Sequence, residues 1–531
     1  MYLCNRISYI TYFKIIKHQT NSTIKKFIYA TLAAVAVLLF ASCKNDKNQP
    51  KKDKADAFIS FTFSLPQGGT RAEAGSVDGA NNGDTFVGTA DEQAIKGVRV
   101  VLFDSNGMVK YALTYNITAT GGNAPTGDIA ANPAQAATAA RFTTKAEKIV
   151  SQDYQMLAIV NPTAAVIAAT EEGKYLKDAQ TAIEATAKDL SANGKAILMS
   201  NDRGLVKVTP SNMKAAADAA EQSPVAVNVD RILAKVYVGG TPTLPTGVTF
   251  TSTKWELNTT NKKTFIYRQF AKVATRLNTF DEETMANNTD RLGRYAKDPN
   301  YLAGEFKAAD FNYKKDVDNL ANEWGFEDTK GQYCLENTMD AGQQLNDQST
   351  SFILSGVWKP ADHKGITFTA GQSFYDFMGF SFTFEKMKEY IAIVNDNTKT
   401  DPDIPETAPG LKAALKALLA EANCPVNAAD GSFTKSFSSK SKIKGYLNGV
   451  CYYQTNLIRH FDNTLSSKDM GYGRYGVVRN NIYKISIKKI SRIGEPTIVP
   501  EKPDPNDPTK LFIAFDITIN PWLVRTQEIS L

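Results

Sequence analysis

The C-terminal stretch of the chain, residues 510–531, limits most strongly what the chain can fold into. Apolar and polar residues alternate along it, which is the pattern of a β-strand with one buried face. A tether with prolines at positions 496, 500, 503, 505 and 508 precedes this strand. It is extended, and it cannot join a central sheet because its prolines have no N–H to donate. The apolar side of the strand carries Leu511, Ile513, Phe515, Ile517 and Ile519, and Trp522 follows.

A long apolar strand on an extended tether is an aggregation hazard unless a sheet takes it up. Two outcomes are therefore open for this strand. It folds back as an edge strand of its own domain, or it completes the sheet of another molecule.

A second alternating segment lies near the other end of the chain, at residues 57–66. The apolar side of its alternating part carries Ile59, Phe61, Phe63 and Leu65, and serine and threonine stand between them. A glycine-rich loop follows, and Arg71 in this loop is the only arginine between positions 6 and 99. Because exposed loops of small residues are where proteases cut, an arginine-specific protease has one obvious target in this region.

The first 43 residues have the organisation of an export signal. Basic residues precede an apolar run at 27–40, and the sequence then closes with Ala41, Ser42 and Cys43. Cys43 resembles the lipidated cysteine of a bacterial lipobox, although Phe40 stands where leucine is commonest. Plain secretion with an incidental cysteine is the alternative. No other apolar run is long enough to span a bilayer, so a lipid would be the only membrane attachment.

The formal net charge of +6 comes from the leader. Residues 1–71 hold 11 of the 61 Lys and Arg residues but only 3 of the 55 acidic residues. Residues 72–531 therefore carry 50 basic and 52 acidic side chains, a net charge of −2. This balance removes the electrostatic case for a nucleic-acid partner.

Few residues suggest catalysis, a cofactor or a metal. His363 and His460 are the only histidines beyond the leader, and HExxH and GxSxG sequences are absent. Residues 471–476 match GxGxxG, but without a preceding strand and a following helix a turn is the better interpretation. The acidic loop at 395–403 lacks the glycine and distal glutamate of a calcium loop, so a solvated loop is favoured. We expect no enzyme, no cofactor and no metal site.

Three cysteines remain beyond Cys43, namely Cys334, Cys424 and Cys451. Their odd number and the lack of CxxC spacing argue against a disulfide framework and against a zinc site. Buried free thiols are the expected state.

Many short strand-like runs with a few helices predict a mostly β protein. Strands are expected at 95–103, 108–115, 156–160, 365–369 and 477–490, with an Asn-Gly hairpin turn at 106–107. A helix is expected at 410–423, where leucines recur along one face. The predicted architecture is two tandem β-sandwich domains, transthyretin-like with Greek-key connections, that carry helical insertions.

Two C-terminal motifs carry a family resemblance. Residues 475–490 read YGVVRNNIYKISIKKI, and a proline-rich linker and a terminal strand with an internal Pro521-Trp522 follow. This arrangement resembles the fimbrillins of the Bacteroidales, which build type V pili. The lipobox ending in Cys43 and the strand before the Arg71 loop resemble most closely the structural subunits of the short (minor) fimbriae. The motifs cover roughly the first 75 and the last 90 residues.

The resemblance implies a route of assembly. Residues 1–43 would be a lipoprotein signal peptide, and residues 44–71 a propeptide with a removable strand. An arginine-specific protease would cut between Arg71 and Ala72. Loss of the strand would open a groove in the domain at 72–225. The domain at 226–500 and a linker with a donor strand at 501–531 would follow, and the donor strand of the next subunit would fill the groove.

The leading functional hypothesis is therefore the shaft subunit of a surface fimbria that serves adhesion and biofilm formation. Its partners would be further copies of itself, accessory anchor and tip proteins, the protease, and the outer membrane through the lipid of the precursor. Two alternatives stay open. The chain is a non-polymerising anchor or tip protein, or it is a glycan-binding surface lipoprotein.

Overall fold

The computed structural model describes most of the chain after the leader. The chain divides into two units, residues 1–56 and residues 57–531, and the fold below is that of the second unit. The described residues are 55–64, 88–118, 126–127, 129–131, 141–181, 183–191, 195–269, 273–274, 279–280, 296–301, 307–314, 320–339, 343–377, 379–396, 398, 411–420, 426–427, 431–433, 443–460, 475–499, 513–521 and 524–527.

A ten-stranded sheet forms the N-terminal half. Its strand order is β5-β4-β3-β9-β11-β13-β2-β7-β6, with β12 also paired to β9. A separate two-stranded sheet pairs β1 with β8. The strands are β1 (Ala57–Ile59), β2 (Phe61–Ser64), β3 (Gly97–Phe103), β4 (Val109–Thr118), β5 (Thr126–Gly127), β6 (Ile129–Ala131), β7 (Arg141–Thr144), β8 (Glu147–Ile149), β9 (Tyr154–Val160), β11 (Met199–Asn201), β12 (Val206–Val208) and β13 (Val225–Arg231).

Two larger sheets form the C-terminal half. The first has the order β22-β14-β28-β29-β30 and the second the order β21-β15-β23-β27. A three-stranded sheet, β25-β24-β26, accompanies them. The strands are β14 (Leu233–Gly239), β15 (Thr249–Asn258), β21 (Asn322–Glu323), β22 (Gln332–Leu335), β23 (Ser351–Lys359), β24 (Phe374–Phe377), β25 (Phe380–Phe382), β26 (Ile443–Tyr446), β27 (Val450–Leu457), β28 (Asn481–Ile490), β29 (Ile513–Pro521) and β30 (Val524–Gln527).

Three short antiparallel pairs lie outside these sheets. They are β10 (Ile183–Glu184) with β17 (Lys263–Thr264), β16 (Thr260–Asn261) with β20 (Phe311–Asn312), and β18 (Val273–Ala274) with β19 (Thr279–Phe280). The chain passes from the N-terminal sheet to the C-terminal sheets at Ile232, between β13 and β14.

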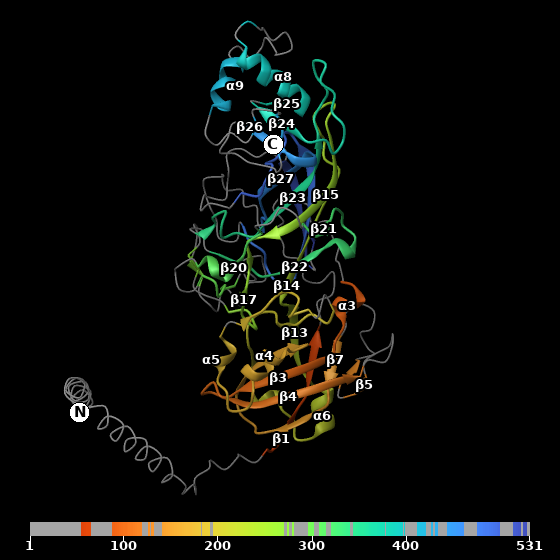
Figure 1. Cartoon of the computed structure of the whole chain (residues 1–531). Coiled ribbons are helices and arrows are strands. Elements are labelled where there is room, and N and C mark those ends of the chain that lie inside the picture. The colour runs from red at the N-terminus through yellow and green to blue at the C-terminus, as the bar shows by residue number, and fades with distance from the viewer. Residues whose placement is uncertain are drawn as a thin grey trace, which may run out of the picture. The chain divides into compact units, whose positions relative to one another are not determined.

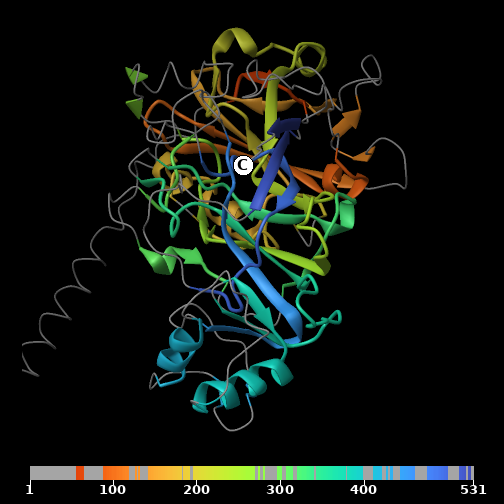
Figure 2. The same cartoon turned by 90° about the horizontal axis from the view of Figure 1, so that it is seen from above.

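Helices are short and few among the described residues. The α-helices are α3 (Ala90–Gln93), α4 (Ala164–Ala169), α5 (Leu176–Ala179), α6 (Ala217–Gln222), α8 (Phe384–Asn395) and α9 (Leu411–Leu419). Figures 1 and 2 show α8 and α9, in cyan, beside the small β24–β26 sheet and away from the orange N-terminal strands. No helix of the described residues is long and apolar enough to span a bilayer.

The strands of the N-terminal sheet bury both faces. In β3, Val98, Val100 and Leu102 belong to one apolar cluster, while Val101 and Phe103 belong to another. The first cluster joins the β3–β9 part of the sheet to the β13–β2 part. The second cluster includes residues of α4 and α5, so these helices cover the opposite face. Strands buried on both faces explain why β3 reads as a nearly continuous apolar run.

The two C-terminal sheets form a sandwich. Val236 of β14 and Ile485 of β28 share one apolar cluster with Trp255 of β15 and Leu354 of β23. Since the first two residues come from one sheet and the last two from the other, the sheets pack face to face.

The predicted mostly β fold with helical insertions is confirmed. The Asn-Gly signal marks a real hairpin, in which Gly107 has φ +73° and Asp104 Oδ1 accepts N–H bonds from Asn106 and Met108. The helix predicted at 410–423 is α9. The strand predicted at 365–369 is wrong. A tight turn closed by the His363–Ile366 bridge stands there, and Gly365 has φ +77°.

Gly356 provides a test of packing in the C-terminal sandwich. It lies in β23, where an added Cβ would meet the ring of Phe250. We expect Gly356→Ala to lower the free energy of unfolding by about 1–3 kcal/mol because the ring must move. Gly97→Ala in β3 is the matched control, since its Cβ would meet Tyr115 O at an ordinary 3.7 Å. Urea unfolding measures both variants, and equal stabilities would contradict the packing described here.

Candidate functional site

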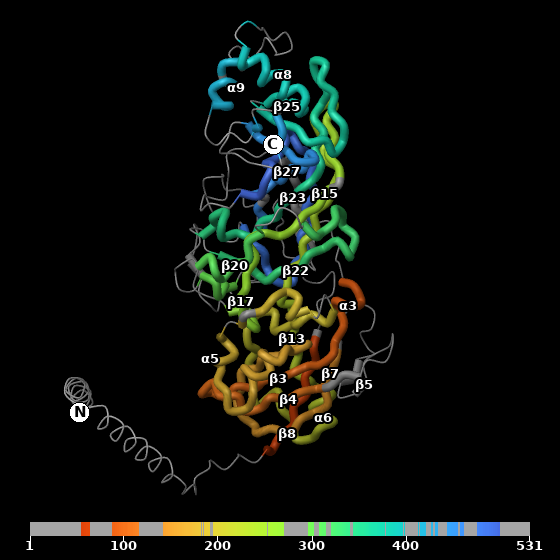
Figure 3. Tube along the Cα trace, in the orientation of Figure 1, coloured from red at the N-terminus to blue at the C-terminus, as the bar shows by residue number. Residues whose placement is uncertain are grey.

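The strand made of β1 and β2 fills a slot inside the N-terminal sheet. Ile59, Phe61 and Phe63 are at most 1% exposed and belong to the apolar cluster shared by β3, β9 and β13. Ser60 and Thr62, on the other face of the strand, are buried as well. The sequence pattern predicted one buried face, whereas the strand is enclosed on both. In Figure 3 this segment is the red tube that runs among the orange strands near β7 and β8.

Three neighbouring strands form the edges of the slot. β2 runs parallel to β13, with Phe61 opposite Val225 and Phe63 opposite Val227. On its other side β2 is antiparallel to β7, with Thr62 opposite Thr143. β1 is antiparallel to β8. Removing residues 57–64 would therefore leave unpaired backbone along β13, β7 and β8.

The step between β1 and β2 has its own contacts. Ser60 Oγ donates to Thr144 O at 2.7 Å, and Phe61 N donates to Thr144 Oγ1 at 3.1 Å. Thr143 Oγ1 also donates to Thr62 Oγ1 at 3.2 Å. The outer face of the strand thus carries small residues, Ser60 and Thr62, that are buried and hydrogen-bonded to the neighbouring strand.

The C-terminal strand lies on its own sheet in this structure. β29 pairs antiparallel with β28 from Ile513 opposite Ile490 to Pro521 opposite Asn481. β30 pairs with β29 and touches β28 at one position, and no further described strand pairs with β30. Of the two outcomes open from the sequence, the isolated chain has the first: the C-terminal segment folds back onto β28, with β30 as the edge strand of the sheet.

Several predicted site residues lie outside the described part of the chain. They are Cys43, Leu65, Arg71, Ala72, Leu511 and Trp522. For Ile513, Phe515, Ile517 and Ile519 the structure gives the backbone pairing alone.

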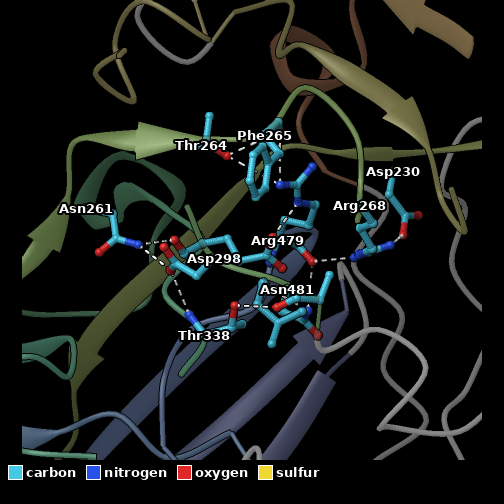
Figure 4. Close-up of polar contacts among 12 residues, drawn as sticks. Asp230, Asn261, Thr264, Phe265, Arg268, Asp298, Thr338, Arg479 and Asn481 are labelled. Carbon is cyan, nitrogen blue, oxygen red and sulfur yellow. Dashed lines mark hydrogen bonds and ion pairs between the residues drawn. The ribbon is translucent and has the colours of Figure 1, made fainter. Parts of the chain in front are cut away.

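A buried polar junction stands where the N-terminal and C-terminal sheets meet. Arg268 Nη1 pairs with Asp230 Oδ2 at 2.6 Å, and Arg479 Nε pairs with Glu336 Oε2 at 2.7 Å. All four side chains are at most 4% exposed. Burial by itself lowers the pKa of Arg268, but Asp230 and Glu336 raise it above its ordinary value. Figure 4 shows these arginines side by side, with Arg479 also reaching Thr264 and Phe265.

The Arg-Asn-Asn sequence of the C-terminal motif builds this junction. Asn480 Nδ2 donates to Asp230 Oδ1 at 2.9 Å, and Asn480 N donates to Leu233 O at 2.7 Å. Asn480 has φ +62°, a left-handed conformation that asparagine tolerates better than most residues. Asn481 Nδ2 donates to the carbonyls of Val478 and Arg479. The motif therefore fixes how β28 begins, and its role is structural.

A third buried ion pair ties α3 to the C-terminal sheet. Lys235 Nζ of β14 lies 2.7 Å from Glu92 Oε1, and both side chains are at most 2% exposed. The ammonium also lies over the rings of Tyr237 and Tyr333, and Tyr333 OH donates to the same carboxylate. Burial alone would raise the pKa of Glu92, but Lys235 and these hydrogen bonds bring it below the ordinary value.

Sequence reasoning missed Asp230, Arg268 and Glu336. A signal was present for the first of them, because Asp230 and Arg231 lie side by side in a largely apolar run from Val225 to Val238, whose other polar residues are Asn228 and Lys235. A charged pair inside such a run indicates a buried ionic contact, since an unpaired charge there is costly. The sequence does not show which opposite charge it meets.

The described residues contain no metal cluster of three or more His, Cys, Asp or Glu side chains. His460 Nδ1 lies 2.8 Å from Tyr483 OH in the core. Cys334 and Cys451 are buried and free, as expected, and burial raises the pKa of each thiol to about 12. Cys424 and most of the GxGxxG sequence at 471–476 lie outside the described residues.

Comparison with known proteins gives one family match. Residues 444–528 match the family "Major fimbrial subunit protein type IV, Fimbrillin, C-terminal". No curated protein sequence matches the chain.

Solved structures similar to this one include three fimbrial proteins. A fimbrilin (FimA) from Porphyromonas gingivalis W83 has 15% identity and a TM-score of 0.39, over 89% of this chain and 99% of that one. The tip fimbrial protein Mfa3 from Porphyromonas gingivalis has 11% identity and a TM-score of 0.33, over 87% and 99%. A fimbrial assembly protein from Parabacteroides distasonis has 12% identity and a TM-score of 0.25, over 59% and 84%.

The junction leads to a stability prediction. We expect Asp230→Asn to lower the free energy of unfolding by about 3 kcal/mol or more, because Arg268 then remains buried without its carboxylate. Glu323→Gln is the control, since Glu323 pairs with Lys254 on the surface and its loss costs at most about 1 kcal/mol. Urea unfolding of both variants checks the difference.

Asp298 leads to a pH prediction. Burial raises its pKa to about 7, although the N–H groups of Asn300 and Thr338 donate to the carboxylate. Between about pH 4 and pH 7 the folded chain therefore binds more protons at this group than the unfolded chain. We expect this carboxyl to lower the free energy of unfolding as the pH rises through that window. The slope should be smaller in Asp298→Asn, and an unchanged slope would contradict this assignment.

Proposed function

With residues 444–528 as the C-terminal region of a fimbrillin, we propose that this chain is a structural subunit of a cell-surface fimbria, assembled by strand exchange after proteolysis. The observation that carries the proposal is the position of β1 and β2. They form a strand at the start of the described fold, buried in a slot between β13 and β7. No catalytic role is proposed.

Excision of this strand would create a strong binding site. Ile59, Phe61 and Phe63 together contribute about 5–9 kcal/mol of gross hydrophobic stabilisation in the slot. Their loss would expose the same apolar walls and leave the backbone of β13 and β7 without partners. Another strand with alternating apolar residues would be bound in their place.

The C-terminal strand has the properties of the replacement. It carries five alternating apolar residues, worth about 8–15 kcal/mol gross if all are buried. Ordering entropy offsets a substantial part of this energy. β29 and β30 lie at the edge of their sheet, so they can leave it without disrupting the pairing of β14 with β28. The remaining stabilisation is sufficient for a persistent, non-covalent polymer.

The rest of the proposal concerns export and processing. The precursor would be lipidated at Cys43 and carried to the outer membrane. An arginine-specific protease would cut after Arg71, so that Ala72 begins the mature subunit. Copies would then polymerise through the slot and the C-terminal strand, Leu511 to Ile519 with Trp522. Accessory anchor and tip proteins would stand at the two ends of the fimbria. The fimbria would serve adhesion and biofilm formation.

One observation favours a second candidate, a non-polymerising anchor or tip protein. β29 is paired with its own β28 along most of its length. A subunit that kept this pairing would not donate its strand. An intact lipid and propeptide on the surface-displayed protein would identify this alternative.

The processing step can be tested with one arginine. We expect treatment of the precursor with an arginine-specific protease to give polymers that resist mild heating in detergent, with a mature N-terminus at Ala72. Arg71→Ala should reduce polymer formation at least tenfold, since the strand then stays in its slot. Arg492→Ala is the matched control, because Arg492 is an exposed arginine far along the chain.

Polymer yield on denaturing gels and N-terminal sequencing measure the result. Equal polymerisation of Arg71→Ala and Arg492→Ala would refute the processing step.

A further inference from the structure

The strand that fills the slot and the strand at the C-terminus have similar sequences. Residues 57–65 read AFISFTFSL, and residues 511–519 read LFIAFDITI. In this alignment Phe58, Ile59 and Phe61 are identical to Phe512, Ile513 and Phe515. A small residue follows the isoleucine in both, Ser60 in the first and Ala514 in the second.

The slot restricts which register the C-terminal strand can take. A shift by one residue would turn its polar residues into the apolar core. A shift by two residues keeps the apolar residues inside but changes which residues occupy the outer face. Side chains there must fit the buried positions of Ser60 and Thr62, which are 1% and 8% exposed. Asp516 is the residue that discriminates among them, because a buried carboxylate needs a hydrogen-bond donor.

Three shifted registers are unfavourable for a C-terminal strand that runs through the slot in the same direction as β2. One puts Asp516 at Ser60, where its carboxylate would face the carbonyl of Thr144. Another puts the large Phe512 at this same small position. A third puts Pro521 at Phe63, in the paired ladder between β13 and β7, where proline has no N–H to donate. The aligned register avoids all three, and it puts Asp516 at Thr62, within reach of the Thr143 hydroxyl that now donates to Thr62.

The direction of the strand has two indicators. Lys148 Nζ lies 5.8 Å from the ring centroid of Phe58, and Phe512 would keep this cation–π contact only if the strand runs as β2 does. The strand made of β1 and β2 also changes partners at the step from Ser60 to Phe61, because β1 pairs with β8 and β2 pairs with β7 and β13. In the β28–β29 pairing, β28 has one extra residue between Ile487 and Lys489, opposite the step from Ala514 to Phe515 that aligns with this change of partner.

We propose that the C-terminal strand enters the slot of a second copy of this chain parallel to β13, with Phe512 at the position of Phe58, Phe515 at that of Phe61 and Asp516 at that of Thr62. This inference rests on the proposed function and adds the register and direction of the exchange. Asp516 and Ala514 become the residues that determine this specificity.

Engineered cysteine pairs test the register. Thr62 lies opposite Thr143, so Asp516→Cys with Thr143→Cys should give a disulfide between copies. Two pairs report registers shifted by two residues, namely Ala514→Cys with Thr143→Cys and Thr518→Cys with Thr143→Cys. Each should give at least fivefold less disulfide-linked product. Each variant is polymerised under reducing conditions, then oxidised and run on denaturing gels without reductant. The parent protein is the control, since its Cys334 and Cys451 thiols are buried.

A second pair tests the direction. Ser64 lies opposite Asn228, which is exposed. Thr518→Cys with Asn228→Cys should cross-link if the strand runs as β2 does, and Ala514→Cys with Asn228→Cys if it runs the other way. Preferential cross-linking of the second pair, or of a pair that reports a shifted register, would overturn the inference and leave strand exchange intact. Absence of polymers from the parent protein would instead refute the proposed function, and the inference with it.

Ala514 allows a test without cysteine. Ala514→Ser should raise the temperature at which polymers dissociate, because its hydroxyl can donate to Thr144 O as Ser60 does now. Ala514→Phe should reduce polymer formation at least tenfold, because the ring does not fit where Ser60 is buried. Unchanged polymer yield with phenylalanine at this position would contradict the register.

Discussion

Each strand inside a buried sheet needs a hydrogen-bonded neighbour on both sides, and β2 is the neighbour that joins β13 to β7. The apolar cluster of the N-terminal half includes Ile59, Phe61 and Phe63 together with β3, β9 and β13. Both the core and the continuity of the sheet therefore depend on a strand contributed from one end of the described chain. Removal of β2 would leave the backbone of β13 and β7 unpaired and expose the apolar cluster, so another strand would have to take its place.

β13 forms one wall of the slot, and it would stay in place without β2 because it pairs with a second strand, β11. Its first half pairs with β2, whereas its second half pairs with β11, with Ser200 opposite Asp230. Asp230 is in turn held by Arg268 and Asn480. Excision of β2 would leave this second half anchored to the junction between the sheets. The Arg-Asn-Asn motif thus supports the wall of the slot from a position near the end of the sequence.

The sequence predicted the class of the fold and the two unusual strands, and it failed where distant segments meet. Alternation at 57–65 and 511–519 marked strands, and leucine spacing marked α9, because these signals are local. The parallel pairing of β2 with β13 has no local signal. The same limit applies to the Arg268–Asp230 and Arg479–Glu336 pairs. The strand expected at 365–369 failed because Gly365 adopts a left-handed conformation that ends it as a turn.

The parallel pairing of β2 with β13 has a consequence for the order of folding. Phe61 meets Val225, about 160 residues later in the chain, so synthesis delivers one partner long before the other. Contacts of such high sequence separation form slowly, because a long loop must close before they contribute. We therefore expect the pairing of β2 with β13 to be a late step in the folding of the N-terminal half. A fold that takes up its own strand late is well suited to accept a similar strand from another molecule.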